Sequence, residues 1–410
     1  MNLSVSSGRS VQIMGFEEAT QANAVRKTVF FEEEFRRVIE KCDPTRPVAV
    51  LAVAGQATMG KSLFFSYALG YLKALEQGNQ DWIGWSDTTM KPLEGFRWAN
   101  GSEIVTKGIW TWSEPITRKN SKGQEFDVLL MDMEGVFDET TVGREWAILA
   151  GMGLLISSIM VLNTSNGVQE DTLKSIQNFL SFGLPPFDRN EISERAKPFQ
   201  NLVFLVHDWE NHEEFPFGNQ GGRKFIERKL EEKPDHDYFH RKLRREVKTG
   251  FENIDCFLFP NPGLATGDSS FTGAIVNATP EYRDFARQMQ LGIEQLLNSD
   301  RFPFKTQNGN NLNAPDIFAM FKSYIEMFNL KAEARSAALK HPTQRLGEST
   351  GMNKARNEGT TQLDAAVYEK ALEQVQKSFE AEQMILEIAI GDGVRLYKTS
   401  MDKLLLSSRT

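Results

Sequence analysis

The chain has 410 residues, and its hydrophobic (40%), charged (25%) and aromatic (10%) fractions are those of an ordinary folded protein, which argues against wholesale disorder. The formal net charge of -8 gives no overall electrostatic attraction for nucleic acid, so no nucleic-acid partner is expected. Cys42 and Cys256 are too few for a disulfide framework or a structural zinc cluster, which indicates a reducing compartment.

The N-terminal sequence MNLSVSSGRS lacks the apolar core of a signal peptide. The chain also has no uncharged run of about 18 apolar residues that could cross a bilayer. We therefore expect the chain itself to be soluble and cytosolic. Its length allows two or more domains.

Between residues 11 and 259, short apolar runs alternate with longer amphipathic stretches, a pattern typical of an α/β fold. Five runs are nearly all apolar, as in strands of a largely parallel sheet that is buried on both faces. Three of them end at Gly55, Asp132 and Asp208, and ligands in open α/β sheets bind beyond the carboxyl ends of strands. The predicted strands are residues 48–54, 128–132, 159–163, 202–207 and 256–259.

The first predicted strand runs into GQATMGKS, which fits the phosphate-binding pattern G-x-x-x-x-G-K-[ST] and opens into the helix-compatible LFFSYALGYLKAL. The glycines let backbone N–H groups point inward, and the helix N-terminus adds partial positive charge. A turn before an ordinary helix would explain the glycines but not the Lys-Ser pair. Lys61 is expected to contact the β- and γ-phosphates and Ser62 to bind Mg²⁺. The predicted nucleotide-binding residues are Gly55, Gln56, Ala57, Thr58, Met59, Gly60, Lys61, Ser62 and Leu63.

Two further segments fit the surroundings of a bound triphosphate. Asp132 and Gly135 form D-x-x-G after a predicted strand, where the carboxylate can hold Mg²⁺ through water and the glycine amide can meet the γ-phosphate. By itself this pattern is usually a turn that ends a strand, and the nearby phosphate loop favours the nucleotide interpretation. Thr106 lies between the two elements, where a hydroxyl is needed to close over Mg²⁺ and the γ-phosphate.

The run LVFLV ends in His207 and Asp208. A carboxylate at this place can accept both the ring N–H and the exocyclic amine of guanine, whereas adenine presents the opposite pattern. The alternative is a capping aspartate, which would be favoured without the other elements.

The C-terminal part changes character after the Asn/Gly-rich residues 307–313, where the strand-like runs stop. Apolar side chains then recur at helical spacing, which predicts three amphipathic helices in a small bundle. The resulting domains are residues 1–308, a linker at 309–313 and a helical domain at 314–410. The apolar stripes are Ile317, Phe321, Tyr324 and Phe328, then Leu363, Val367, Ala371, Val375 and Phe379, and a shorter helix over residues 394–406.

Several longer motifs resemble the atlastins, dynamin-superfamily GTPases that fuse endoplasmic reticulum membranes. The resemblance covers roughly residues 10–330 and implies a Ras-like P-loop GTPase domain with a mostly parallel sheet, followed by a helical middle domain. TKGIW and the D-x-E-G form are also similar to the guanylate-binding proteins, the sister group. The segments are GFRWANGSE, TKGIWTWSEP, LLMDMEGVFD, ISSIMVLNTSNGVQEDTL, LVFLVHDWENHEEFPFGNQGGRKFI and CFLFPNPGL.

By position, the resemblance implies that Lys61 and Ser62 serve phosphate and Mg²⁺. Thr106 would be the switch I magnesium ligand, Asp132 the water-mediated magnesium partner and Gly135 the switch II glycine. The resemblance therefore implies Lys61, Thr106 and Gly135 as catalytic residues and Mg²⁺ as the cofactor of GTP hydrolysis.

The resemblance also implies that Asp208 reads guanine, in place of the N-K-x-D motif of other GTPases. In the family an arginine precedes this position, and here the residue is His207. An imidazole can stack or hydrogen-bond near the base, but it lacks the planar fork of the guanidinium. His207 is expected to contact the nucleotide.

Both related groups carry an arginine within the phosphate loop at the position of Thr58, and that arginine supplies charge to the transition state. Such an arginine contributes on the order of 10³–10⁵ in rate across GTPases, so slow hydrolysis is expected unless another cation replaces it. The candidates for this replacement are Arg97, Lys107 and Arg144.

The resemblance implies a GTPase whose domains dimerise when GTP orders the switches, and whose helical bundle draws membranes together. It implies a homodimer at the cytoplasmic face of the endoplasmic reticulum, with membrane attachment through segments that this chain lacks. Two alternatives stay open. One is a GTP-binding tether or scaffold that barely hydrolyses, and the other is an assembly factor like the guanylate-binding proteins.

Overall fold

A computed structural model describes the backbone of twelve stretches of the chain. Every described element belongs to one compact unit, Met1–Gly183 with Glu194–Lys340. A second unit, Leu184–Ser193 with His341–Thr410, lies outside the described residues. The described stretches are residues 8–17, 26–55, 60–85, 95, 108–134, 143–183, 197, 199–264, 271, 273–275, 278–307 and 309–340.

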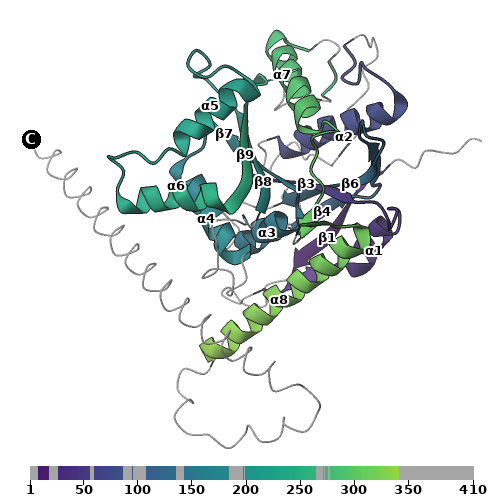
Figure 1. Cartoon of the computed structure of the whole chain (residues 1–410), viewed down its shortest axis with the longest axis vertical. Helices are drawn as coiled ribbons and strands as arrows, with labels where there is room; N and C mark the ends of the chain where they lie inside the picture. The colour runs from purple at the N-terminus through teal and green to yellow at the C-terminus, as the bar shows by residue number, and fades with distance from the viewer. Residues whose placement is uncertain are drawn as a thin grey trace, which may run out of the picture. The chain divides into compact units, whose positions relative to one another are not determined.

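A sheet of nine described strands forms the centre of the first unit, in the order β2-β1-β4-β6-β3-β7-β8-β9, with β5 beside β6 (Figure 1). Five neighbouring strands in this order are parallel to one another. They coincide with the five predicted strands, which are therefore confirmed, although three begin earlier than predicted. These strands are β6 (Glu125–Glu134), β3 (Val48–Gly55), β7 (Ile159–Ser165), β8 (Phe199–His207) and β9 (Phe251–Leu258).

The other four strands extend the sheet in antiparallel fashion and were not predicted. They are short, and polar residues interrupt their apolar ones, so the continuous apolar signal is lost. They are β1 (Ser10–Phe16), β2 (Thr28–Phe30), β4 (Gly108–Trp112) and β5 (Ile116–Lys119), and a separate two-stranded hairpin is formed by β10 (Thr306–Gln307) and β11 (Asn310–Asn311).

Helices cover both faces of the sheet (Figure 1). α2 and α7 pack together on one face, while α3, α4 and α6 pack on the other. α5 lies along β9. The bounds are α1 (Glu32–Ile39), α2 (Lys61–Gln77), α3 (Gly143–Ile156), α4 (Glu170–Gly183), α5 (Asn219–Lys229), α6 (Tyr238–Gly250), α7 (Pro280–Leu296) and α8 (Ala314–Lys340).

A hydrophobic core fills the space between the sheet and the pair α2 and α7. Its polar centre is the buried Tyr67 hydroxyl, 2.6 Å from the hydroxyl of Tyr282, which donates to the carbonyl of Gly273 at 3.1 Å. The loop after α2 is fixed to α7 by two indole N–H groups. Trp82 donates to Glu294 at 2.9 Å, and Trp85 donates to Gln290 at 2.7 Å. The core therefore holds α2, the helix after the phosphate loop, firmly on the sheet.

Helix α8 packs against α1 and β2. Phe318 and Phe321 meet Phe35 of α1 at ring-centroid distances of 5.7 and 5.0 Å, and Phe321 also meets Phe30 of β2 at 5.4 Å. The predicted stripe over residues 317–328 is therefore confirmed as a helix face with buried residues. None of the described helices is both long and apolar enough to cross a bilayer. The predicted helices at 363–379 and 394–406 lie outside the described residues, so the division into domains stays a prediction.

One side chain of α8 also bonds to the main chain of β2. The side-chain oxygen of Asn329 accepts from the amide of Thr28 at 2.9 Å and from its hydroxyl at 2.7 Å, while the side-chain nitrogen donates to the carbonyl of Thr28 at 2.9 Å. Nearby, Lys322 forms an ion pair with Glu32 of α1 at 3.1 Å, and both of these side chains are partly exposed. Asn329 therefore completes the hydrogen bonding of an edge strand.

We predict that Asn329→Leu lowers the free energy of unfolding by about 2–3 kcal/mol, because it leaves the buried amide and carbonyl of Thr28 without partners. Lys322→Met in the same interface should cost less than about 1 kcal/mol, because an exposed ion pair contributes little. Urea denaturation of both variants measures the difference. Equal losses would contradict the role given to Asn329.

Candidate functional site

The parallel strands bring three of the predicted site residues to one edge of the sheet. Gly55 ends β3, Asp132 lies near the end of β6, and Asp208 directly follows β8. β6 and β7 flank β3, and β8 follows β7. Neighbouring strands are about 4.8 Å apart, so Asp208 lies about 10 Å across the sheet from the start of the phosphate loop.

The described parts of the phosphate loop have the geometry that the motif requires. A Cβ at Gly55 would lie 2.5 Å from the carbonyl oxygen of Asn163, so only glycine fits between the strands there. Gly60 has φ +80°, a left-handed conformation that glycine adopts without strain. α2 begins directly after Gly60 with no side-chain cap from the described residues. This end of the helix therefore presents main-chain N–H groups of the kind that bind phosphate.

Lys61 is the first residue of α2, and its side chain is only 4% exposed. Its ammonium group donates to the carbonyl oxygen of Gly55 at 3.2 Å. The ammonium therefore lies next to the last residue of β3. This arrangement places a positive charge beside the helix N-terminus, where an anion is favoured.

Asp132 is 3% exposed and lies opposite Val53 of β3 and Trp110 of β4 in the sheet. A buried carboxylate is an oxygen ligand of the kind that Mg²⁺ prefers, and the next strand along the sheet leads into the phosphate loop. Asp132 therefore fits a magnesium site. In the parts of the chain that the structure describes, three His, Cys, Asp or Glu residues nowhere gather into a metal-binding group.

Asp208 lies directly after β8 with φ +55°, a left-handed conformation that is uncommon outside glycine. One carboxylate oxygen accepts from the hydroxyl of Ser165 at 2.7 Å, and the other accepts from the side-chain nitrogen of Asn261 at 2.6 Å. Ser165 ends β7, and Asn261 follows β9. Both neighbouring strands therefore contribute to the position of the carboxylate.

The apolar runs and motifs of the sequence do not single out Ser165 or Asn261. The signal available was their place: each is a polar residue at the carboxyl end of a predicted strand, as Asp208 is. Recognising it requires the strand order β7-β8-β9, which apolar runs do not reveal.

His207 packs in the core side of the sheet. It is 6% exposed, and its ring lies 5.5 Å from the ring of Phe259 and 5.9 Å from that of Phe285. Its Nε2 atom has no hydrogen-bond partner among the described residues. Burial lowers the pKa of His207 from 6.5 to about 4, against the opposing charge of Asp208. The imidazole is therefore neutral near pH 7. It packs against Phe259 and Phe285 at the end of β8. Its expected contact with the nucleotide stays a prediction.

Several predicted residues lie outside the described residues, and their roles stay predictions. The side chain of Ser62 is also outside the description, as is that of Arg144, one of the three candidate replacements for the missing arginine. The residues whose main chain is not described either are Gln56, Ala57, Thr58, Met59, Thr106 and Gly135, together with Arg97 and Lys107.

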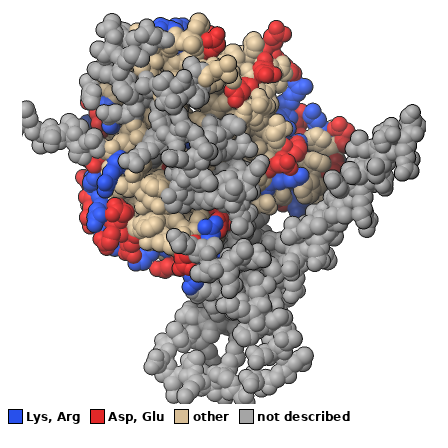
Figure 2. Space-filling model, turned by 180° about the vertical axis from the view of Figure 1, so that it is seen from behind, with Lys and Arg blue, Asp and Glu red and all other residues tan. Residues whose placement is uncertain are grey.

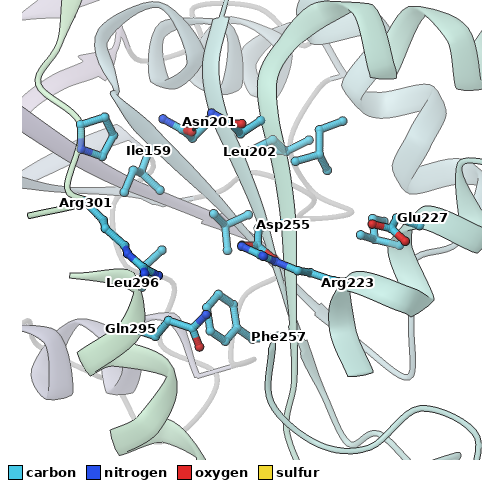
Figure 3. Close-up of a pocket in the computed structure, with 15 residues that line it drawn as sticks. Ile159, Asn201, Leu202, Arg223, Glu227, Asp255, Phe257, Gln295, Leu296 and Arg301 are labelled. Atoms are coloured by element: carbon cyan, nitrogen blue, oxygen red, sulfur yellow. Dashed lines mark hydrogen bonds and ion pairs between the residues drawn. The ribbon is translucent and has the colours of Figure 1, made fainter. Parts of the chain in front are cut away.

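A groove of about 410 Å³ lies away from this edge, between α5 and α7, and is lined by the first residue of β7 and by residues 201–203 of β8 (Figure 3). Arg223 in the groove forms an ion pair with Asp255 at 2.9 Å. With Arg301 and Glu227, the lining has two positive and two negative side chains. The groove is therefore distinct from the strand ends where the predicted residues meet. On the face seen in Figure 2, acidic and basic side chains alternate around the described surface and form no large patch of one sign.

Comparison with known proteins gives a consistent family. A model of the guanylate-binding protein N-terminal domain matches residues 27–299. Atlastin-1 of Mus musculus is 33% identical over 331 residues, which are 80% of this chain and 56% of the relative. Atlastin-3 of Rattus norvegicus is 34% identical over 312 residues, 75% of this chain and 54% of the relative. The chain thus spans about half the length of these curated relatives.

Because the native imidazole of His207 binds its proton near pH 4 and the unfolded one near 6.5, we predict a loss of stability as the pH falls through this window. As the pH falls, the unfolded state binds the proton first. The contribution of the neutral His207 to the free energy of unfolding is therefore fully present above pH 6.5 and is lost below about pH 4. A difference of about 2.5 in pKa corresponds to about 3 kcal/mol. His207→Phe should remove this part of the pH dependence in urea denaturation between pH 4 and 7.

Phe259→Leu provides the control, because it disturbs the same packing without removing the titrating ring. It should lower stability by a similar amount at each pH and keep the slope. If His207→Phe loses as much stability between pH 7 and pH 4 as the parent does, the neutral, buried state of the ring does not cause the pH dependence.

Proposed function

The chain belongs to the guanylate-binding protein family of GTPases, with atlastins among its relatives, and on this premise we propose that it binds GTP where β3, β6 and β8 end and hydrolyses it to GDP and phosphate. The observation that carries the proposal is the distance of two strands between the phosphate loop and Asp208. This spacing suits a nucleoside triphosphate whose phosphates lie on α2 and whose base reaches β8.

The base is the first part of the proposal. Guanine presents two neighbouring donors, the ring N–H and the exocyclic amine, and a carboxylate accepts both. Asp208 is an acceptor at the edge of the sheet, held from two sides by Ser165 and Asn261. A site built to accept two hydrogen bonds rejects a base that offers one donor and one acceptor, because a polar group is then left unpaired. This supports guanine over adenine.

The phosphates are the second part. The start of α2 supplies N–H groups and the positive end of the helix dipole, and Lys61 supplies a full charge beside them. Because the ammonium lies within hydrogen-bond distance of Gly55, a small rotation of its side chain suffices to meet a β- or γ-phosphate oxygen. Thr106 and Gly135 are proposed to close over the γ-phosphate from the two switch segments.

We propose that Mg²⁺ accompanies the nucleotide, with Ser62, Thr106 and, through water, Asp132 as its ligands. When bound, the ion neutralises negative charge on the β- and γ-phosphates. Of these residues, Asp132 has a described side chain, and its burial beside β3 fits the part. The chain itself holds the phosphates in place with Lys61 and the helix N-terminus and orients the base with Asp208.

Hydrolysis by this chain is proposed to be slow. Thr58 stands where the related proteins carry the phosphate-loop arginine, so a positive charge is missing from the transition state. The same substitution supports the second candidate function, a GTP-binding tether or scaffold that is regulated by nucleotide binding more than by turnover. Arg97, Lys107 and Arg144 are the residues proposed to supply the charge if turnover is fast.

We further propose a homodimer that forms through the GTPase domain in the GTP state and acts at the cytoplasmic face of the endoplasmic reticulum, where it tethers and fuses membranes. Helix α8 and the segment after it are proposed to transmit the nucleotide state. The first residue of β3, Val48, bonds to Lys305 at 2.7 Å and to Leu312 at 2.9 Å, just before α8. One strand therefore joins the phosphate loop at one end to the start of α8 at the other, which supports this coupling. An assembly role like that of guanylate-binding proteins is the remaining alternative.

The rate of phosphate release tests the role of Thr58. We expect slow turnover by the chain and a gain on the order of 10³ in Thr58→Arg, because the arginine restores charge at the γ-phosphate. Thr58→Ala is the matched control and should turn over as slowly as the parent. Rapid release by the parent with no gain in Thr58→Arg would overturn the missing-arginine argument and the tether function with it.

Light scattering with nucleotide tests dimerisation. A non-hydrolysable GTP analogue with Mg²⁺ should double the measured mass, and GDP should leave the chain monomeric, because the γ-phosphate orders the switches. Lys61→Ala should abolish the response, since it removes the charge that holds the phosphates. A mass that is the same in every nucleotide state would exclude the proposed cycle.

A further inference from the structure

Selecting guanine requires more than a carboxylate at the end of β8. The torsion that turns a carboxylate about its own axis is broad, so an unsupported Asp208 presents its two oxygens in many orientations. Guanine donates a hydrogen bond to each oxygen only when both oxygens lie in the plane of the base. The residues that fix this orientation therefore contribute to selectivity without touching the base.

Two side chains are placed to do this. The Ser165 hydroxyl donates to one oxygen of Asp208 at 2.7 Å, and the Asn261 side-chain nitrogen donates to the other at 2.6 Å. Hydrogen bonds to an ionised acceptor are about twice as strong as neutral ones. Because the two donors come from β7 on one side and from the loop after β9 on the other, they restrain the carboxylate from opposite directions.

The orientation of Asn261 is fixed by its own second bond. Its side-chain oxygen accepts from the amide of Gly263 at 2.8 Å, so the nitrogen must face Asp208. The main chain around Asp208 is held as well. The amide of Trp209 donates to the carbonyl of Phe259 at 3.0 Å, and the amide of Asn166 donates to the carbonyl of His207 at 2.9 Å. The side chains and the main chain around Asp208 are therefore held by the neighbouring strands on both sides.

The number of bonds matters as much as their direction. An ionised carboxylate accepts about four hydrogen bonds, two at each oxygen. Ser165 and Asn261 use one site on each oxygen and leave one on each. The remaining sites match a ligand with two adjacent donors.

We propose that Ser165 and Asn261 are positioning residues that set guanine selectivity by clamping the carboxylate of Asp208. The inference rests on the proposed function, since it assumes that Asp208 faces a guanine base. Loss of either donor leaves the carboxylate held by one hydrogen bond, so the whole group can turn about its own axis. A base with one donor, such as hypoxanthine, still finds an oxygen, whereas guanine loses the second bond.

The test compares the affinities of GDP, IDP and ADP for the full chain by isothermal titration calorimetry with Mg²⁺. IDP carries hypoxanthine, which lacks the exocyclic amine of guanine. In Ser165→Ala we expect GDP to bind about tenfold more weakly, the loss of one charge-assisted hydrogen bond, while IDP weakens much less. The GDP-to-IDP preference therefore falls by several fold. Ser165→Thr keeps the hydroxyl and should restore the preference.

Asn261→Ala provides a second variant, at an exposed loop position where folding is not at risk. It should lower the GDP-to-IDP preference in the same direction. A purely structural role would weaken GDP and IDP by equal factors and lower the melting temperature, and this outcome would overturn the clamp. So would an unchanged preference in both variants while the parent still selects guanine. If the parent itself binds ADP as well as GDP, the proposed function fails, and the clamp fails with it.

Discussion

Parallel pairing of five buried strands is the constraint on which the rest of the molecule depends. Because β6, β3, β7, β8 and β9 run in the same direction, all their carboxyl ends emerge at one edge. Residues that are more than 150 positions apart in the chain then reach the same edge, as Gly55 and Asp208 do. The site needs no loop of special shape to bring its parts together, because the strand order does so.

The parts that sequence predicts well are those whose cause is local. A strand buried on both faces must be apolar throughout, so residues 48–54 and 202–207 can be predicted from their composition. The phosphate loop has a recognisable motif because its glycines, lysine and serine each meet a separate steric or electrostatic requirement. β1 and β4 are missed because polar residues and glycine interrupt their apolar residues, a pattern that loops share. Ser165 and Asn261 escape for a different reason: each is 43 or 53 residues from Asp208, and their meaning comes only from strand order.

His207 shows how burial sets the charge of a side chain. An imidazole is neutral or cationic near pH 7 depending on its surroundings. The structure gives His207 a core position among phenylalanine rings, where the charged form is disfavoured and the pKa falls to about 4. A guanidinium cannot lose its charge in this way, so an arginine at this position would stay positively charged where the histidine is neutral. The neutral ring of His207 therefore places no positive charge next to Asp208.

The two ends of the described sheet are both closed to further strand pairing. β2 is only three residues long, and Asn329 occupies the amide and carbonyl of Thr28. At the other end, Gly218 exchanges two main-chain hydrogen bonds with Leu258 of β9, at 2.7 and 3.3 Å, just before α5. Exposed strand edges act as templates for aggregation, and short or covered edges suppress it. Within the described part of the chain, pairing of the sheet with a strand from another molecule is therefore disfavoured.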